Sequence, residues 1–232
     1  MCEGTSLANR YPGSECDDLA NRIARMHGVA PEQVVLGCGS SEILRVTAVT
    51  FLGPRKKLVM ASPSWNLIAD FARSAGAEVV TVPLNKEYAH DLSAMLARID
   101  RSTGLVYICN PNDPTGSLTP QGELVAFIRR LPSTTYIVID QAYHHYAVGC
   151  PRDASVIEYP VDDSRLIVTR TFSGDLRARG ITRRIWDCRS AHGAPAGCWA
   201  TALLRQRCRG KGCRSRTQRC RACQDLCAAK CE

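Results

Sequence analysis

The sequence predicts an α/β fold in which helices cover both faces of a mostly parallel sheet, a three-layer arrangement. Two observations lead to this prediction. Short runs rich in Val, Ile and Leu recur along residues 1–173, and segments with apolar residues at helical spacing separate them. Turns rich in Gly, Pro and Asn follow several of the runs. Strands that alternate with helices are joined by crossovers, which make neighbouring strands parallel.

The expected elements can be placed in chain order. We expect strands at residues 34–36, 58–61, 78–82, 105–109, 136–139 and 166–168, and helices at 16–26, 42–51, 67–75, 92–99 and 119–131. Thr119 is expected to cap the last helix, with Pro120 at its first position. Ligands bind at the carboxyl ends of parallel strands, so the site is expected where the turn-rich segments follow the strands.

Charge and cysteine content change sharply near Ser173. Residues 1–173 contain 16 Lys and Arg against 18 Asp and Glu, whereas residues 174–232 contain 14 against 4. The second segment also holds 8 of the 13 cysteines. We therefore expect two parts, a folded domain over 1–173 and a basic, Cys-rich, unstructured tail over 174–232. No apolar run reaches the ~18 residues of a membrane helix, and residues 1–12 lack a secretory signal pattern, so we expect a cytoplasmic protein without membrane contact.

Gly39-Ser40-Ser41-Glu42 is expected to join a strand to a helix. Free N–H groups at a helix start attract anions, and small residues let a phosphate approach. A tight turn with no ligand explains the same residues equally well. The segment is not a dinucleotide fingerprint, because Glu42 stands where the third Gly would be.

Three further motifs are more specific. Asn110-Pro-Asn-Asp-Pro-Thr-Gly116 follows one predicted strand, Asp140-Gln-Ala-Tyr143 ends the next, and Thr169-Arg-Thr-Phe-Ser173 ends the one after. In this order and spacing they resemble fold-type I aminotransferases, which depend on pyridoxal phosphate, and the histidinol-phosphate type most closely. Asn9-Arg10-Tyr11-Pro12 fits the same family. The resemblance covers roughly residues 5–173 and implies the large domain of that family, here in truncated form.

The resemblance implies how the cofactor ring would be held. Asp140 would pair with the pyridine nitrogen, because a protonated ring is the electron sink of this chemistry. Tyr143 would donate a hydrogen bond to the phenolic oxygen. Trp65 matches the aromatic residue that stacks on the ring. Without the resemblance, Asp140 would be interpreted as a strand-end cap and Trp65 as a core residue.

It also implies how the phosphate would be held and what the partners are. Ser40 and Ser41 would bind the phosphate through backbone amides, Ser173 through its hydroxyl, and Tyr11 from the neighbouring subunit of a homodimer. Tyr11 could equally be an exposed residue with no such role. The reaction would transfer an amino group from histidinol phosphate or an amino acid to a 2-oxo acid. His144 and His145 have no role in the family and are interpreted as structural.

Two departures from the family pattern concern the site itself. The family has Asn immediately before Pro-Thr-Gly, where its amide donates to the phenolic oxygen; here that residue is Asp113, preceded by Asn112. A carboxylate beside a phenolate is repulsive. Either Asn112 makes the contact instead, or the affinity for the cofactor is reduced. The second departure is Gly174, which stands where the family has its Schiff-base lysine. The catalytic set therefore lacks its covalent anchor and its acid–base group, and we expect little or no transaminase activity.

The tail suggests a cause for the missing lysine. Back-translation of residues 175–187 with a shift of one nucleotide permits a good continuation of the family, including its Ala-Gly-x-Arg segment, although the shifted triplet over Gly174 and Asp175 begins with G and does not restore a lysine codon. We therefore hypothesise a frameshift near codon 174. The hypothesis would be contradicted if resequencing of the DNA found the same frame intact and expressed homologues shared this tail.

Two alternatives to an aminotransferase remain. The first is a non-catalytic remnant of the fold. The second gives the tail a function of its own, as a zinc- or nucleic-acid-binding module built on Cys208, Cys213, Cys220, Cys223, Cys227 and Cys231. The spacing matches no standard zinc site, and the tail has only two aromatic residues, Trp186 and Trp199, for stacking on bases. We expect neither a metal site nor a nucleic-acid partner.

Overall fold

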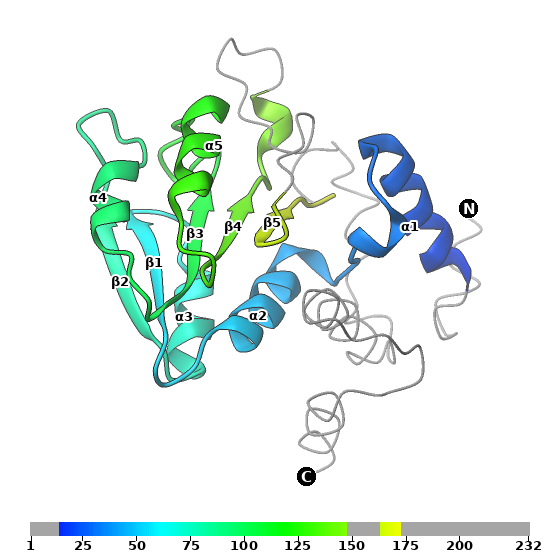
Figure 1. Ribbon diagram of the computed structural model, residues 1–232. Helices are drawn as coiled ribbons and strands as arrows, with labels where there is room; N and C mark the ends of the chain where they lie inside the picture. Colours follow the sequence, from blue (N-terminus) through cyan, green and yellow to red (C-terminus); the bar gives the residue numbers. More distant parts are fainter. Residues whose placement is uncertain (1–13, 148–162, 173–232) are drawn as a thin grey trace. The chain divides into compact units, whose positions relative to one another are not determined.

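The computed structural model describes residues 14–147 and 163–172. They belong to two compact units. The described part of one unit contains helix α1 (Ser14–His27) and a short 3-10 helix, η2 (Pro31–Gln33). The other unit begins at Cys38 and contains every strand of the described chain (Figure 1).

The larger unit is built on a five-stranded, fully parallel sheet. Its strands are β1 (Lys57–Ser62), β2 (Glu78–Pro83), β3 (Thr103–Cys109), β4 (Tyr136–Asp140) and β5 (Leu166–Thr169). Their order in the sheet is β2-β1-β3-β4-β5. The central strand β3 is buried along its whole length, which explains its unbroken apolar run. The predicted parallel α/β fold is confirmed.

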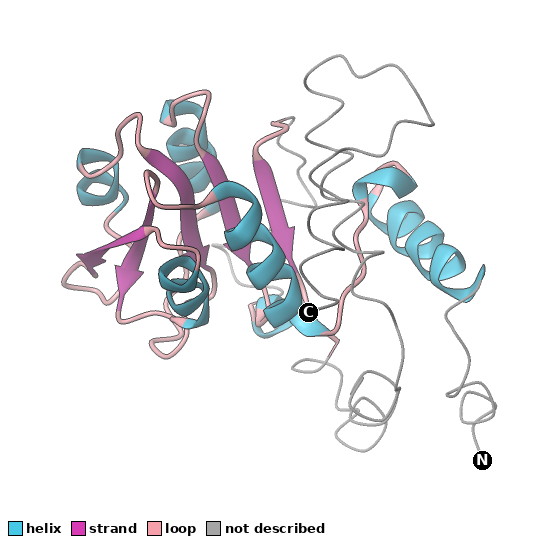
Figure 2. Ribbon diagram, turned by 90° about the horizontal axis from the view of Figure 1, so that it is seen from below, coloured by secondary structure: helices cyan, strands magenta, loops and turns pink. Residues whose placement is uncertain are grey.

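Helices cover both faces of this sheet (Figure 2). Helices α4 (Leu92–Ala97) and α5 (Gln121–Arg130) pack on one face, where Met95 and Phe127 contact Val106 and Ile108 in a common core. Helices α2 (Gly39–Phe51) and α3 (Leu67–Ser74) pack on the other face. The alternate residues of β3 supply both cores, so the strand fixes the two helix layers relative to each other.

A glycine and an arginine fix the ends of these elements. A Cβ at Gly104, the second residue of β3, would collide with the carbonyl oxygen of Phe51, so α2 can approach the strand only over a glycine. The Arg165 guanidinium donates to the carbonyl oxygens of Leu131 at 2.9 Å and Pro132 at 2.7 Å. It thereby ties the start of β5 to the end of α5.

Two predicted features were wrong. Residues 34–36 form no strand, because the N–H of Val34 donates to the carbonyl of Pro31 at 3.1 Å and closes a turn. Thr119 does not cap α5, which begins at Gln121 with Pro120 as its N-cap. The Thr119 hydroxyl instead lies 3.1 Å from Nδ1 of His90, a buried side chain.

Candidate functional site

The carboxyl ends of β3, β4 and β5 place the three sequence motifs side by side. Cys109 pairs with Asp140 across β3 and β4, and Asp140 pairs with Thr169 across β4 and β5. Main-chain bonds continue this contact beyond the strands: Asn110 N–H donates to the Asp140 carbonyl, and Gln141 N–H donates to the Thr169 carbonyl, both at 2.8 Å. The predicted convergence of the motifs at one sheet edge follows from this register.

Asp140 is the chemically most unusual group of this edge. Its side chain is 2% exposed, and burial raises the pKa of its carboxyl. Three donors hold it: the Tyr107 hydroxyl at 3.0 Å, the Thr169 hydroxyl at 2.8 Å and the Ala142 N–H at 3.2 Å. Each of these bonds opposes the effect of burial on that pKa. No Lys, Arg or His of the described chain forms an ion pair with it.

A buried carboxylate without a cationic partner is costly unless a positive group pairs with it. A protonated pyridine nitrogen is such a group, and it would donate one further hydrogen bond. The donor set at Asp140 therefore fits the cofactor that the sequence suggests. The chemistry of that cofactor, when bound, is to accept the electrons of a substrate carbanion.

The loop from Asn110 to Gly116 is held by side chains rather than by regular structure. The Asn110 amide donates to the Thr119 carbonyl at 3.0 Å and accepts from the Thr119 N–H at 2.8 Å. These two bonds close the base of the loop. Asn110 is 1% exposed, so the pair is shielded from water.

Asn112 connects this loop to the segment after β1. Its carbonyl accepts from the Ser64 hydroxyl at 2.7 Å, and its amide donates to the Pro63 carbonyl at 3.2 Å and the Thr115 hydroxyl at 2.8 Å. Both ends of the amide are therefore engaged within the protein. The sequence left open whether Asn112 donates to the phenolic oxygen in place of the missing Asn. These contacts do not support that possibility.

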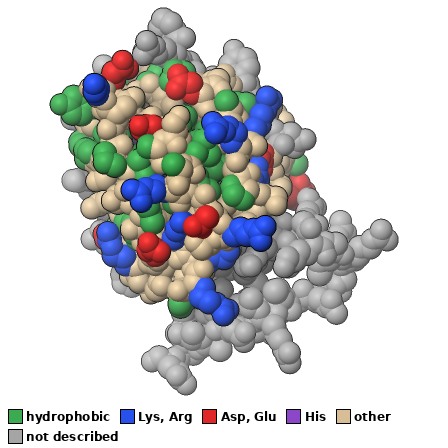
Figure 3. Space-filling model, turned by 60° about the vertical axis from the view of Figure 1, so that its left-hand side comes forward, with side chains coloured by type: hydrophobic (Ala, Val, Ile, Leu, Met, Phe, Trp, Pro, Cys, Tyr) green, Lys and Arg blue, Asp and Glu red, His purple; other side chains and the backbone are tan. Residues whose placement is uncertain are grey.

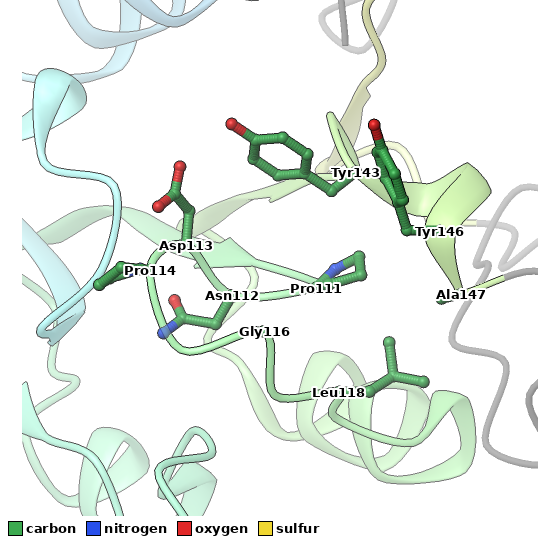
Figure 4. A pocket seen from close by; sticks show the side chains of 9 residues that line it. All are labelled: Pro111, Asn112, Asp113, Pro114, Gly116, Leu118, Tyr143, Tyr146 and Ala147. Carbon is green, nitrogen blue, oxygen red and sulfur yellow. The ribbon is translucent and has the colours of Figure 1, made fainter. Parts of the chain in front are cut away.

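A pocket of about 420 Å³ lies against this loop. Its lining comes from the loop and from the segment after β4: Pro111, Asn112, Asp113, Pro114, Gly116, Leu118, Tyr143, Tyr146 and Ala147. Figure 4 shows the Asp113 carboxylate and the Tyr143 hydroxyl on the same side of the pocket, facing each other. Burial, followed by the negative charge of Asp113 and a hydrogen bond with it, raises the pKa of Tyr143.

The remaining predicted residues are distributed as follows. Trp65 follows β1 and is 43% exposed, so it is not a core residue, and Ser64 beside it bonds to Asn112 of the pocket loop. Ser40 and Ser41 lie in the first turn of α2, whose N–H groups have no acceptor within the helix. The Glu42 carboxylate lies at the same helix end and accepts from Cys38 N–H at 2.7 Å. Tyr11 and Ser173 lie outside the described residues.

Sequence reasoning missed two residues that shape the site. Tyr107 is fully buried in β3 and donates to Asp140, and His90 supports the loop base through Thr119. The signal for Tyr107 was available: it is the only hydroxyl-bearing residue in the apolar run 105–109, two residues before the strand ends. No sequence signal identified His90, because its partner is distant along the chain.

Comparison with known proteins identifies the family. The model of the class I and II aminotransferases matches residues 4–182 of the chain. The chain belongs to this family. Among curated aminotransferases, it is 36% identical over 163 residues to histidinol-phosphate aminotransferase of Caldicellulosiruptor saccharolyticus, covering 70% of this chain and 45% of that one. It is 33% identical over 175 residues to aromatic amino acid aminotransferase of Nocardia farcinica, covering 75% of this chain and 49% of that one.

Solved aminotransferase structures agree with this assignment. Histidinol-phosphate aminotransferase of Sinorhizobium meliloti, solved in complex with pyridoxal-5'-phosphate, superposes with a TM-score of 0.65 at 30% identity, over 75% of this chain and 49% of that one. The aminotransferase chain described here thus spans about half the length of the relatives that it matches. The predicted resemblance to aminotransferases of the histidinol-phosphate type is confirmed.

Among residues 14–147 and 163–172, no helix has the length and apolar character needed to cross a bilayer, and no group of three His, Cys, Asp or Glu is arranged to hold a metal ion. The cysteines of the tail lie outside this range. On the face of the molecule in Figure 3, Lys and Arg side chains are interspersed with Asp and Glu and form no continuous basic patch.

Proposed function

We propose that this chain carries the ring-binding part of a pyridoxal-phosphate-dependent aminotransferase site and binds the cofactor non-covalently. The observation that carries the proposal is Asp140, a buried carboxylate with three donors and no cationic partner in the described chain. Asp140 would hold the proton on the pyridine nitrogen. Trp65 would cover one face of the ring, and Tyr143 would donate to its phenolic oxygen.

The phosphate would lie at the start of α2. There the N–H groups of Ser40 and Ser41 belong to the first turn and have no acceptor within the helix, and the helix dipole favours an anion. Ser173 and the partner's Tyr11 would complete the phosphate site in a cytoplasmic homodimer. Histidinol phosphate or an amino acid would be the amino donor, and a 2-oxo acid the acceptor. The two curated relatives differ in their named substrates, which is why the donor is proposed only as a class.

We further propose that the chain has little or no transaminase activity. No lysine occurs between Lys86 and Lys211, and Gly174 follows Ser173. A lysine at that point would both anchor the cofactor and move the substrate proton, and acid–base catalysis alone contributes about 10²–10⁴-fold to a rate. A frameshift near codon 174 and an unstructured tail remain our hypotheses for this part of the chain. The alternative is a remnant that binds no cofactor.

The test is equilibrium binding of pyridoxal phosphate to the full chain, followed by borohydride reduction and peptide mapping. We expect saturable binding with one site per chain and no adduct on a defined lysine. Asp140→Asn should weaken binding about tenfold or more, since a hydrogen bond to a charged group contributes about 1.5–3 kcal/mol.

Asp70→Asn is the matched control. Asp70 lies exposed on α3 in an ion pair with Arg73, so this change should leave binding unaltered. Absence of saturable binding, or equal loss in both variants, would refute cofactor binding and favour the remnant. A stoichiometric adduct on one lysine, accompanied by amino transfer, would refute the proposed inactivity.

A further inference from the structure

The pocket contains a carboxylate, that of Asp113, at the position where related aminotransferases have the amide of an asparagine. Asp113 and Tyr143 face each other across it (Figure 4). Burial, followed by the neighbouring carboxylate of Asp113, raises the pKa of Tyr143, so the tyrosine faces Asp113 as a neutral hydroxyl. Asp113 supplies the only carboxylate among the nine residues that line the pocket.

Asn112 cannot relieve this charge. It is 2% exposed, and its amide is engaged with Pro63, Ser64 and Thr115. Turning the amide away from these partners would break three hydrogen bonds. Asp113 is thus the acidic side chain that the loop offers to a ligand.

In the described chain, the charged side chains at and near the pocket are all acidic. Asp113 is the only charged residue among the nine that line it. The second nearby charge is Asp140, close enough for each carboxylate to be felt by Tyr143. No Lys, Arg or His lines the pocket within residues 14–147 and 163–172. At the position beside Asp113, such a site favours a cationic group of a ligand over a neutral or anionic group.

We propose that Asp113 makes this site select the amine form of the cofactor, pyridoxamine 5'-phosphate, whose 4-aminomethyl group is an ammonium ion at neutral pH. The inference rests on the proposed function, which places Tyr143 at the phenolic oxygen of the ring. The 4-substituent is the neighbour of that oxygen on the ring, and Asp113 faces Tyr143 across the pocket (Figure 4). An ammonium group there pairs with the carboxylate. An aldehyde or alcohol leaves the carboxylate unpaired beside the phenolic oxygen.

The proposal also relates to the missing lysine. An enzyme that holds the aldehyde form does so through a covalent bond to lysine, and no lysine occurs between Lys86 and Lys211 here. The amine form cannot make such a bond and is held only by non-covalent contacts. An ion pair with Asp113 would therefore stabilise the amine form of the cofactor, whose binding does not depend on a covalent bond to lysine.

The test compares two ligands that share the ring and the phosphate and differ only at the 4-position. Pyridoxamine 5'-phosphate carries the ammonium group and pyridoxine 5'-phosphate carries a neutral alcohol; neither reacts with surface lysines. Dissociation constants of both are measured on the full chain by calorimetry at pH 7.5 and low salt. We expect the amine to bind about tenfold more tightly than the alcohol, a preference scaled for a partly exposed charge pair. Asp113→Asn should reduce the preference to about twofold or less.

Asp113→Ser provides a second variant of different size, and Asp70→Asn is the control that removes one negative charge far from the pocket loop in sequence. Circular dichroism of each variant establishes that the fold is retained. Equal affinity for the two ligands in the wild type, or a preference that survives both Asp113 variants, would overturn the role of Asp113 while leaving the proposed function intact. Failure of both ligands to bind would overturn the proposed function and this inference together.

Discussion

Replacing Tyr107 by Phe removes one of the three donors to Asp140 and leaves the packing of the ring nearly unchanged. The lost bond joins a fully buried hydroxyl to a carboxylate that is 2% exposed, at 3.0 Å. Hydrogen bonds to charged groups contribute about 1.5–3 kcal/mol, so we expect Tyr107→Phe to lower the free energy of unfolding by about 2 kcal/mol at pH 7.

The pH dependence of this loss in stability distinguishes a hydrogen bond to the ionised Asp140 carboxylate from an effect of side-chain packing alone. Burial raises the pKa of Asp140, so the folded state gains stability from this group at low pH and loses it as pH rises through the raised pKa. The Tyr107 hydroxyl stabilises the ionised form. Its removal should therefore matter most at neutral pH and progressively less as falling pH protonates Asp140.

Urea unfolding followed by circular dichroism measures the effect at several pH values, from pH 8 down to the lowest pH at which the protein remains folded. Tyr136→Phe is the matched control, because Tyr136 lies on the next strand and its half-buried ring stacks on Phe51 with centroids 3.8 Å apart. We expect a loss below about 0.5 kcal/mol for the control. A Tyr107→Phe loss that equals that of the control, or that stays constant across this pH range, would refute the account of Asp140.

Three further changes test the supports of the site. Asn110→Ala should lower the free energy of unfolding by about 2–4 kcal/mol in urea titrations, because it leaves a buried N–H and a buried carbonyl of Thr119 without partners. Burial lowers the pKa of His90 from 6.5 to about 4, so the unfolded chain binds its proton first and stability should fall by up to about 3 kcal/mol as pH drops through this window. His90→Gln should flatten that dependence; an unchanged pH profile would contradict it. Gly104→Ala should destabilise by several kcal/mol because its Cβ meets the α2 backbone, whereas Gly122→Ala in α5, where a Cβ meets nothing, should raise the thermal midpoint slightly.

The sequence was most informative where burial dictates composition. The run Leu105–Cys109 is apolar because β3 is covered on both faces, and such a run at that length is typical of a central parallel strand. Short motifs at the ends of β3, β4 and β5 then predicted where the candidate site lies, since parallel strands bring their carboxyl ends to one edge. Residues 34–36 have a similar composition and yet form no strand, because apolar character alone does not supply a hydrogen-bonded neighbour.

Contacts between segments far apart in sequence could not be predicted. The position of Thr119 before a proline suggested a helix cap, but its hydroxyl meets His90, 29 residues earlier in the chain. Whether Asn112 or Asp113 serves the pocket was likewise open, because the answer depends on Ser64, 48 residues away. Both cases are decided by which loops the fold places together.

Under the proposed function, the residues that would hold the ring nitrogen precede the point where the sequence departs from the family. The carboxylate of Asp140 needs Tyr107 from β3, its own strand β4 and Thr169 from β5, and β5 ends at Thr169. The change in sequence character begins only at Gly174, beyond the last residue of this network. The hypothesised lesion at that point would remove the family's lysine without removing any donor to Asp140. Under the proposed function, loss of amino transfer therefore does not require loss of the contacts that hold the ring nitrogen, and the two have to be measured separately.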